Sequence, residues 1–318
     1  MRAVTTSGRW IWGLAGLITT VALVIPGTKL ITSAGVHGQD AQPQSTATRT
    51  VTVPQPVTSL AVQSYGAPVL VMAGPVRRVQ ITETFLYDAQ PGGSSAEPQS
   101  VKPHSAVAQA GGSSVKPQSA PGGPLSGPPE VVQSVSGGHL SLSAPACALS
   151  DCSVSFAVTV PPGLTVTAVT GGGPVTVSGI AGANLDSGGG PVHATMISGP
   201  LTVSTEGGSL MLAGLVGPLR ADTGGGPLSA QGLASATATV ITGGGDAWVA
   251  FSAAPDTVSV STDGGPATLT VPGGPYALTT DTGGSPQLVA IATDPAAGRS
   301  ITVSTGGAPL QIEPSASR

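Results

Sequence analysis

The sequence predicts an all-β protein that winds into a parallel β-solenoid, or β-helix, of about 17–23 residues per coil, preceded by one hydrophobic helix. Two observations lead to this prediction. A glycine-rich signature of the form Thr-Gly-Gly-Gly-Pro recurs, with variations, eight times in the C-terminal half. Between the signatures, apolar and β-branched residues alternate with polar ones, as in half-buried strands. The residues preceding the glycines mark the period: Thr170, Ser187, Thr205, Thr223, Thr242, Thr262, Thr282 and Thr305.

Aligning the repeats on these corner residues separates the remaining positions by chemistry. The positions two and four residues before the corner are apolar in nearly every repeat, and the position between them is polar throughout. Successive side chains of a strand point to opposite faces, so the apolar positions should face the core. The same alternation returns after the corner, so each repeat supplies at least two strands. We expect an interior and an exterior set: Val177, Leu212 and Val249 inside, and Thr167, Thr202 and Thr302 outside.

The glycines have a conformational reason to recur. A tight corner in every coil needs a residue with positive φ, which glycine adopts without a steric penalty. The proline that often follows opens the next strand with a fixed φ at a position that needs no ladder donor. Because the 47 glycines and 30 prolines are largely periodic, they predict ordered coils rather than low-complexity disorder.

The composition argues against nucleic acid as a partner. The net charge is −4, and only 8% of the residues are charged. All three lysines lie outside the glycine repeat, at Lys29, Lys102 and Lys116. Binding driven by counterion release from phosphates needs a basic face, which the repeat lacks.

The N-terminal segment is the one part of the chain with a helical, membrane-directed pattern. Residues 10–25 are apolar and uncharged, with Arg2 and Arg9 before them and Lys29 behind. Extended to residue 31, the run predicts a transmembrane signal anchor over residues 10–31 and a cytoplasmic tail at residues 1–9. The positive flank predicts a single-pass protein of the cell membrane with its bulk extracytoplasmic. A signal peptide that is cleaved, leaving a secreted protein, is the alternative.

The remaining chain divides by composition. Residues 32–56 are polar and rich in Thr, Gln, Ala and Pro, which predicts a flexible stalk. Strand rhythm predicts the first coils at residues 57–90 and the main repeat domain at residues 130–314, with a short tail at 315–318. Between them, residues 91–129 duplicate Gly-Gly-Ser-Ser and Ser-Val-Lys-Pro motifs without an apolar period. This pattern predicts a disordered insertion at one corner, which a solenoid tolerates at low entropic cost.

Taken together, these features resemble the bacterial putative-adhesin family, the domain of unknown function 4097. The resemblance rests on the glycine-corner repeat, the Val-Pro-Pro-Gly element at residues 160–163, a small cysteine loop ahead of it and the single N-terminal hydrophobic segment. It covers most of residues 57–314 and implies an extracytoplasmic β-solenoid with an adhesin-like role. It supplies no catalytic residues. The chain departs from the family in its long insertion and in its Gly-Pro corners, where relatives often have Gly-Asp.

Cys147 and Cys152 enclose only four residues, and a close isolated pair on the outer side of a membrane usually forms a disulfide. The alternative is a pair of buried free thiols. A zinc site is disfavoured because there is no second cysteine pair and no nearby pair of histidines.

The sequence shows no set of residues for catalysis, cofactor binding or a metal, so we expect no enzyme activity and no cofactor. The four histidines are scattered, and the glycine runs lack the Lys-Ser/Thr pair of a phosphate-binding loop. Four aspartates beside corners invite a calcium interpretation, but calcium-binding β-rolls repeat an aspartate every nine residues. These aspartates are Asp186, Asp222, Asp263 and Asp281.

By elimination, the sequence predicts a binding module for a macromolecule of the cell envelope or surface. One outward position of the repeat carries His193, Met211 and Trp248, and we expect these three residues to form the contact face. Packing of Trp248 over its neighbours is the structural alternative. Two other functions remain open: an inert spacer that presents the insertion, and a polysaccharide-active β-helix enzyme.

Overall fold

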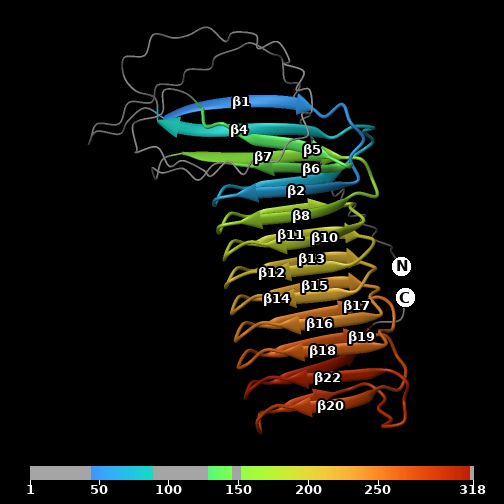
Figure 1. The fold of residues 1–318 in the computed structure, drawn as a ribbon. Coiled ribbons are helices and arrows are strands. Elements are labelled where there is room, and N and C mark those ends of the chain that lie inside the picture. Colours follow the sequence, from blue (N-terminus) through green and yellow to red (C-terminus); the bar gives the residue numbers. More distant parts are fainter. Residues whose placement is uncertain (1–43, 89–127, 145–151, 316–318) are drawn as a thin grey trace, which may run out of the picture. The chain divides into compact units, whose positions relative to one another are not determined.

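The computed structural model describes residues 44–88, 128–144 and 152–315, all within one compact unit, Gln42–Arg318. Every regular element in these ranges is a β-strand, and the strands form two long sheets, most of whose pairings are parallel (Figure 1). The all-β, solenoid-like fold predicted from the sequence is therefore confirmed.

We call the sheets A and B. Sheet A runs, in spatial order, β1 (Gln44–Thr52), β4 (Gln80–Asp88), β7 (Ser153–Val160), β3 (Val69–Ala73), β9 (Val175–Ser178), β11 (Val192–Ile197), β13 (Leu210–Leu215), β15 (Leu228–Leu233), β17 (Ala247–Phe251), β19 (Ala267–Val271), β23 (Leu310–Pro314) and β21 (Gln287–Val289). Sheet B runs β5 (Val132–Ser136), β6 (His139–Ser143), β2 (Ser59–Ser64), β8 (Thr165–Thr170), β10 (Gly182–Asp186), β12 (Leu201–Ser204), β14 (Leu219–Asp222), β16 (Thr237–Ile241), β18 (Thr257–Ser261), β22 (Ser300–Ser304) and β20 (Ala277–Asp281).

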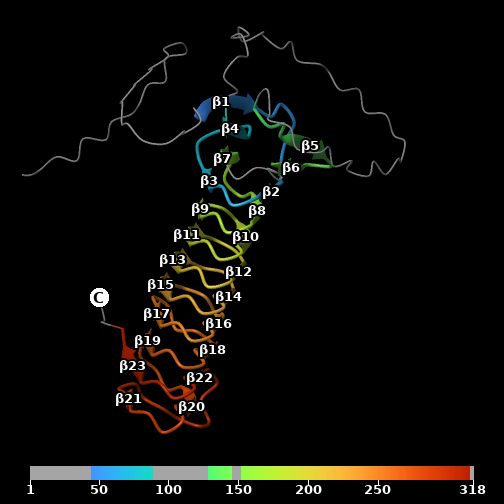
Figure 2. The same cartoon turned by 90° about the vertical axis from the view of Figure 1, so that its left-hand side faces the viewer.

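Each central coil contributes one strand to sheet B and then one to sheet A, as the alternating path in Figure 2 shows. Neighbouring coils are in register. In sheet B, Ala183 lies opposite Leu201, and Leu201 lies opposite Leu219, so equivalent residues are 18 positions apart. The columns inferred by aligning the repeats therefore correspond to real ladders of paired residues across the central coils.

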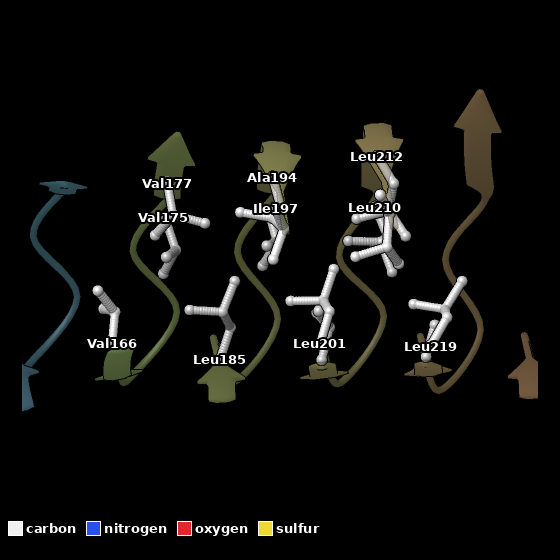
Figure 3. Packing of buried hydrophobic residues seen from close by; sticks show 14 of the residues in the cluster. Val166, Val175, Val177, Leu185, Ala194, Ile197, Leu201, Leu210, Leu212 and Leu219 are labelled. Atoms are coloured by element: carbon white, nitrogen blue, oxygen red, sulfur yellow. The ribbon is translucent and has the colours of Figure 1, made fainter. Parts of the chain in front are cut away.

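The core lies between the sheets and consists of the predicted apolar columns (Figure 3). Val177, Leu212 and Val249 are at most 3% exposed, while Thr167, Thr202 and Thr302 are exposed. This in-and-out assignment is confirmed. Figure 3 shows Leu185, Leu201 and Leu219 of sheet B pointing toward the residues of sheet A.

The corner residues are polar, yet they are buried. Each corner hydroxyl donates a hydrogen bond to the carbonyl oxygen three residues later, at 2.7 Å from Thr170 to Gly173 and 2.8 Å from Thr205 to Gly208. The same bond closes the corners at Ser187, Thr223, Thr242, Thr262, Thr282 and Thr305. A buried carbonyl needs a donor, which explains why serine or threonine recurs at this position.

The corner glycines serve two purposes, of which the sequence predicted one. Gly189 and Gly207 have φ of 113° and 111°, as expected for a tight corner. The next glycine is required for space: a Cβ on Gly208 would lie 2.2 Å from the carbonyl oxygen of Gly190 in the adjacent coil. Close stacking therefore leaves no room for a side chain at Gly208, whereas the equivalent position in coil β22–β23 holds Ala308.

The last two coils are exchanged in space, contrary to the chain order that the repeat suggested. Strand β22 lies between β18 and β20, and β23 lies between β19 and β21. Val258 thus pairs with Ile301, which in turn pairs with Leu278. The outermost coil has polar residues at inward positions, where the Thr280 hydroxyl and the Gln287 side-chain oxygen are 2.9 Å apart. It is suited to leave one side open to water, whereas the fully apolar coil β22–β23 is not.

The other end is built in a similar way. Coil β2–β3 lies between coil β6–β7 and coil β8–β9, although it comes first in the chain. Strand β4 does not continue the coil, as we had expected for residues 57–90, but pairs antiparallel with β1 and β7. Residues 44–52 form β1, so this part of the expected stalk at 32–56 is a paired strand instead.

Several predictions fall outside the described residues. These are the tail at 1–9, the anchor at 10–31, the stalk up to residue 43, the insertion up to residue 127, Cys147 and residues 316–318. Within the ranges that are described, no helix has the length and apolar character to cross a bilayer.

Candidate functional site

The outward face of sheet A carries the predicted contact residues in a single ladder. We call this ladder the outer column; in spatial order it reads Leu70, Thr176, His193, Met211, Ser229, Trp248, Thr268, Gln311 and Leu288. The structure thus places His193, Met211 and Trp248 in one ladder, as the sequence predicted. Leu288 lies beyond Gln311, although it precedes Gln311 in the chain, because the last two coils are exchanged in space.

The structure brings two of the three predicted contact residues directly together. His193 pairs with Met211, while Ser229 separates Met211 from Trp248. Met211 is 48% exposed and Trp248 is 39% exposed, so part of each side chain is accessible to solvent. His193 is half-buried. The three residues therefore share one accessible face, and their role in contact remains a prediction.

Sequence reasoning missed an exposed methionine beside this face. Met196 in β11 is 65% exposed and has a positive φ of 54°, which is rare outside glycine. In the next two coils the same position holds Gly214 and Gly232, with φ of 68° and 63°. The sequence contained a signal of this feature, because Met196 takes a position that is glycine in the next two repeats. Backbone strain that exposes an apolar side chain is a pointer toward function.

A groove of about 300 Å³ lies at the far end of the same face, over β19, β23 and β21. Its walls pair a row of prolines with the last members of the outer column: Pro266, Pro309 and Pro286, and Thr268, Gln311 and Leu288. Leu288 is 56% exposed. Since Thr268 also pairs with Trp248, the groove is continuous with the tryptophan.

The outward face of sheet B differs in character. Its central column is almost wholly polar and contains no aromatic residue: Thr167, Asn184, Thr202, Arg220, Thr239, Ser259, Thr302 and Thr279. Sheet B therefore offers a hydroxyl-rich surface that serves as an internal comparison for the apolar features of sheet A.

The aspartates beside the corners have structural partners. The side chains of Asp186, Asp222 and Asp281 each accept a hydrogen bond from the amide two residues later, at 3.3, 3.1 and 3.1 Å. Asp263 has φ of 47° at the position where other coils have glycine, a conformation that aspartate tolerates. These carboxylates close turns, and no group of three or more potential ligands gathers around a common point in the described ranges.

The two histidines that the structure describes lie on different sheets. His139 in β6 contacts the hydroxyl of Ser59, and His193 belongs to sheet A. Among the described residues they do not form a pair that could share a proton or a metal.

One ion pair was not anticipated from the sequence. Glu83 of β4 is fully buried, and its Oε2 accepts hydrogen bonds from the Arg49 side chain of β1 at 2.6 and 2.7 Å. The Arg49 guanidinium also lies 5.9 Å from the centre of the Phe85 ring. This cluster ties β1 to β4 in the antiparallel cap and lies at the opposite end of sheet A from the groove.

Only one of the two cysteines of the predicted disulfide lies among the described residues. Cys152 is partly buried just ahead of β7, whereas Cys147 lies outside the described residues. The bond between them stays a prediction.

Comparison with known proteins finds similarity to two solved structures. No family model matches the chain, and no curated protein matches it. A putative cell adhesion protein from Clostridium sporogenes covers 85% of this chain with 100% of its own, at 10% identity and a TM-score of 0.22. A putative adhesin from Bacteroides fragilis covers 85% of this chain with 97% of its own, at 11% identity and a TM-score of 0.33.

Proposed function

We propose that this protein is a non-catalytic binding module with an adhesin-like or envelope-binding role, and that the outward face of sheet A is its contact surface. His193, Met211 and Trp248 lie at the centre of that surface. In this proposal the predicted anchor at residues 10–31 tethers the coils to the membrane, with the bulk of the chain on the extracytoplasmic side.

The observation that carries the proposal is the grouping of exposed large apolar side chains on one face of a regular sheet. Met196, Met211 and Trp248 are 65%, 48% and 39% exposed. Covering such surface is favourable by roughly 25 cal/mol per Å² of apolar area. The sheet holds these side chains in place, so little further ordering would oppose binding. Methionine and tryptophan are also enriched in interface cores.

The two alternatives make different predictions for the same surface. If the coils are an inert spacer for the insertion, substitutions on sheet A will not change attachment. If the protein is a polysaccharide-active enzyme, a proton-transfer pair is needed on one face. Asp186, Asp222 and Asp281 are engaged in corner turns, which supports binding without catalysis.

The test uses the full chain and isolated cell envelopes from its own source. A triple variant, His193→Ser, Met211→Ser and Trp248→Ala, should retain its β-sheet circular dichroism and cosediment with the envelopes at least about tenfold less tightly. The matched control carries Thr202→Ala, Thr239→Ala and Thr302→Ala on sheet B and should bind as the wild type does. Full retention by the first variant would overturn the assigned face. Failure of antibodies against the coils to label intact cells, when they label permeabilised cells, would overturn the assigned location.

A further inference from the structure

The end of the outer column nearest the groove forms a continuous strip with its own chemistry. The strip runs from Trp248 through Thr268 and Gln311 to Leu288, across β17, β19, β23 and β21. Three strand spacings separate its ends, about 14 Å. Prolines 266, 309 and 286 form its wall, and the groove of about 300 Å³ occupies its far half.

Polar groups without internal partners surround Trp248. Ser229 and Thr268 are its direct neighbours in the ladder, and the exposed Asp246 lies two residues earlier, just before β17. The side chains of these three residues make no hydrogen bond or ion pair with any other described residue. A partly exposed indole is thus close to two hydroxyls and a carboxylate that are available to a ligand.

The charges near the strip indicate what kind of ligand it suits. Asp246 is an ionisable residue close in sequence to Trp248, and the five arginines of the described ranges lie in other parts of the fold. Arg220 lies on sheet B, Arg299 faces Asp256 at 4.0 Å, Arg49 belongs to the antiparallel cap, and Arg77 and Arg78 lie between β3 and β4. With no cation on the strip and one carboxylate beside it, an anionic polymer would be repelled. The electrostatics fit an uncharged ligand rich in hydroxyl groups.

We propose that this strip binds an extended, uncharged oligosaccharide, which names the ligand class of the contact surface and rests on the proposed binding function. The apolar C–H face of one sugar ring stacks on the Trp248 indole. Its hydroxyls donate to Asp246 and exchange hydrogen bonds with Ser229 and Thr268. The following sugar units lie in the groove along the proline wall, where Gln311 and Leu288 provide one polar and one apolar contact.

The experiment follows Trp248 itself. Replacing Trp10 and Trp12 with phenylalanine in the full chain leaves Trp248 as the single tryptophan. Emission of this protein is titrated with three neutral polymers, hydroxyethyl cellulose, galactomannan and dextran, and with anionic alginate and heparin. We expect at least one neutral polymer to shift the emission to the blue and to protect the indole from acrylamide, and the anionic polymers to leave it unchanged.

Variants then locate the contact by affinity electrophoresis in gels that contain the neutral polymer. Trp248→Ala should weaken binding about tenfold or more, and Trp248→Phe, which keeps a smaller ring, should lose less. Asp246→Asn and Thr268→Val should each weaken it several-fold by removing one hydrogen-bonding group. Thr202→Ala on the outward face of sheet B is the matched control that should bind as the parent does.

Two results would overturn the inference. One is that none of the three neutral polymers changes the emission, whether or not the anionic polymers bind. The other is that Trp248→Ala leaves the binding of a neutral polymer intact. The proposed function fails separately, when the triple sheet A variant attaches to envelopes as well as the wild type. Loss of envelope attachment in that variant without any response to neutral polymers would point to a protein partner. That outcome would support the proposed binding function and exclude a neutral oligosaccharide as the ligand.

Discussion

The central coils and the coils at the C-terminal end have the same repeat but follow different rules of assembly. From β10 to β19, each coil packs on the one that precedes it in the chain. Beyond β19 the chain first builds the outermost coil, β20–β21, and then returns to place β22–β23 between it and β18–β19. The coil whose inward residues tolerate water on one side therefore takes the outermost position in the stack.

Side-chain chemistry explains the difference. At the inward positions, coil β22–β23 carries Ile301, Val303, Leu310 and Ile312, all at most 2% exposed. Coil β20–β21 carries Thr280 and Gln287 at equivalent positions and pairs them with each other. A polar pair at the end of the core loses little in contact with water, whereas an apolar layer would lose its hydrophobic stabilisation.

The largest effect on stability is expected when an aspartate replaces an inward residue of a central coil, in comparison with the same column in the outermost coil. Val249→Asp in a central coil would bury an unpaired carboxylate and should lower the free energy of unfolding by about 3–5 kcal/mol. Val289→Asp in the outermost coil, where the side chain is only partly buried, should cost about 1 kcal/mol or less. Chemical denaturation followed by circular dichroism measures both. Equal costs would mean that the two coils do not differ in burial.

A truncation tests the exchanged order directly. A stop after residue 299 removes β22 and β23, which hold the outermost coil to the rest of the stack. Amide protection in hydrogen exchange should therefore vanish over residues 277–289 as well, while β12 to β17 stay protected. If the coils were stacked in chain order, β20 and β21 would remain protected on β18 and β19.

The next comparison concerns the third residue after the corner, which is glycine in most coils. A Cβ on Gly226 would meet the carbonyl oxygen of Gly208 at 2.2 Å, so Gly226→Ala should destabilise the protein by about 2–3 kcal/mol through overpacking. The same column in the outermost coil already holds Ser285. Ser285→Ala should change the unfolding free energy by about 0.5 kcal/mol, mainly from the hydrogen bond to Gly307. Melting temperatures of the two variants provide the test, and a tolerated Gly226→Ala would show that the coils can separate.

The smallest effect is a dependence on alkaline pH confined to the terminal coil. Tyr276 is fully buried, and its hydroxyl donates to the carbonyl of Pro272 at 2.9 Å. Burial raises the Tyr276 pKa above its ordinary value of 10.0, and Arg299 opposes this in part. Because the folded state prefers the neutral phenol, this stabilisation is complete below pH 10 and is lost as the pH rises through the raised pKa.

Hydrogen exchange above pH 10 would complicate the measurement, so limited proteolysis across the loop between β19 and β20 is the better readout. Cleavage should accelerate with pH in the wild type and much less in Tyr276→Phe, while the central coils remain resistant. Equal acceleration in the two proteins would exclude Tyr276 as the cause.

The candidate site was predictable to the extent that it depends on a single strand. His193, Met211 and Trp248 were assigned to one outward column because each follows its corner by the same number of residues, and the structure puts them in register. The groove was not predictable, since it needs Leu288 beside Gln311 and Gln311 beside Thr268. That order arises only from the exchange of the last two coils.

The N-terminal cap shows the same limit. Val79 and Ile81 flank the outward Gln80 just as apolar residues do in a coil strand, and this alternation predicts successive coils over residues 57–90. Strand β4 instead runs antiparallel to β1 and β7. An alternating pattern shows which side chains are buried, but it carries no information about the direction of the neighbouring strand.

The class of the fold, the corners and the side of the sheet on which each central residue lies follow from the local period and from backbone conformations that glycine permits, so they could be predicted from the residues alone. Which coils are neighbours, where the stack ends and which outward side chains meet depends on contacts between distant parts of the chain. Strands pair through backbone groups that are nearly the same at every residue, so these groups do not select a particular neighbouring strand. The neighbour is selected by how completely the apolar side chains of two coils, which can be far apart in the sequence, cover one another.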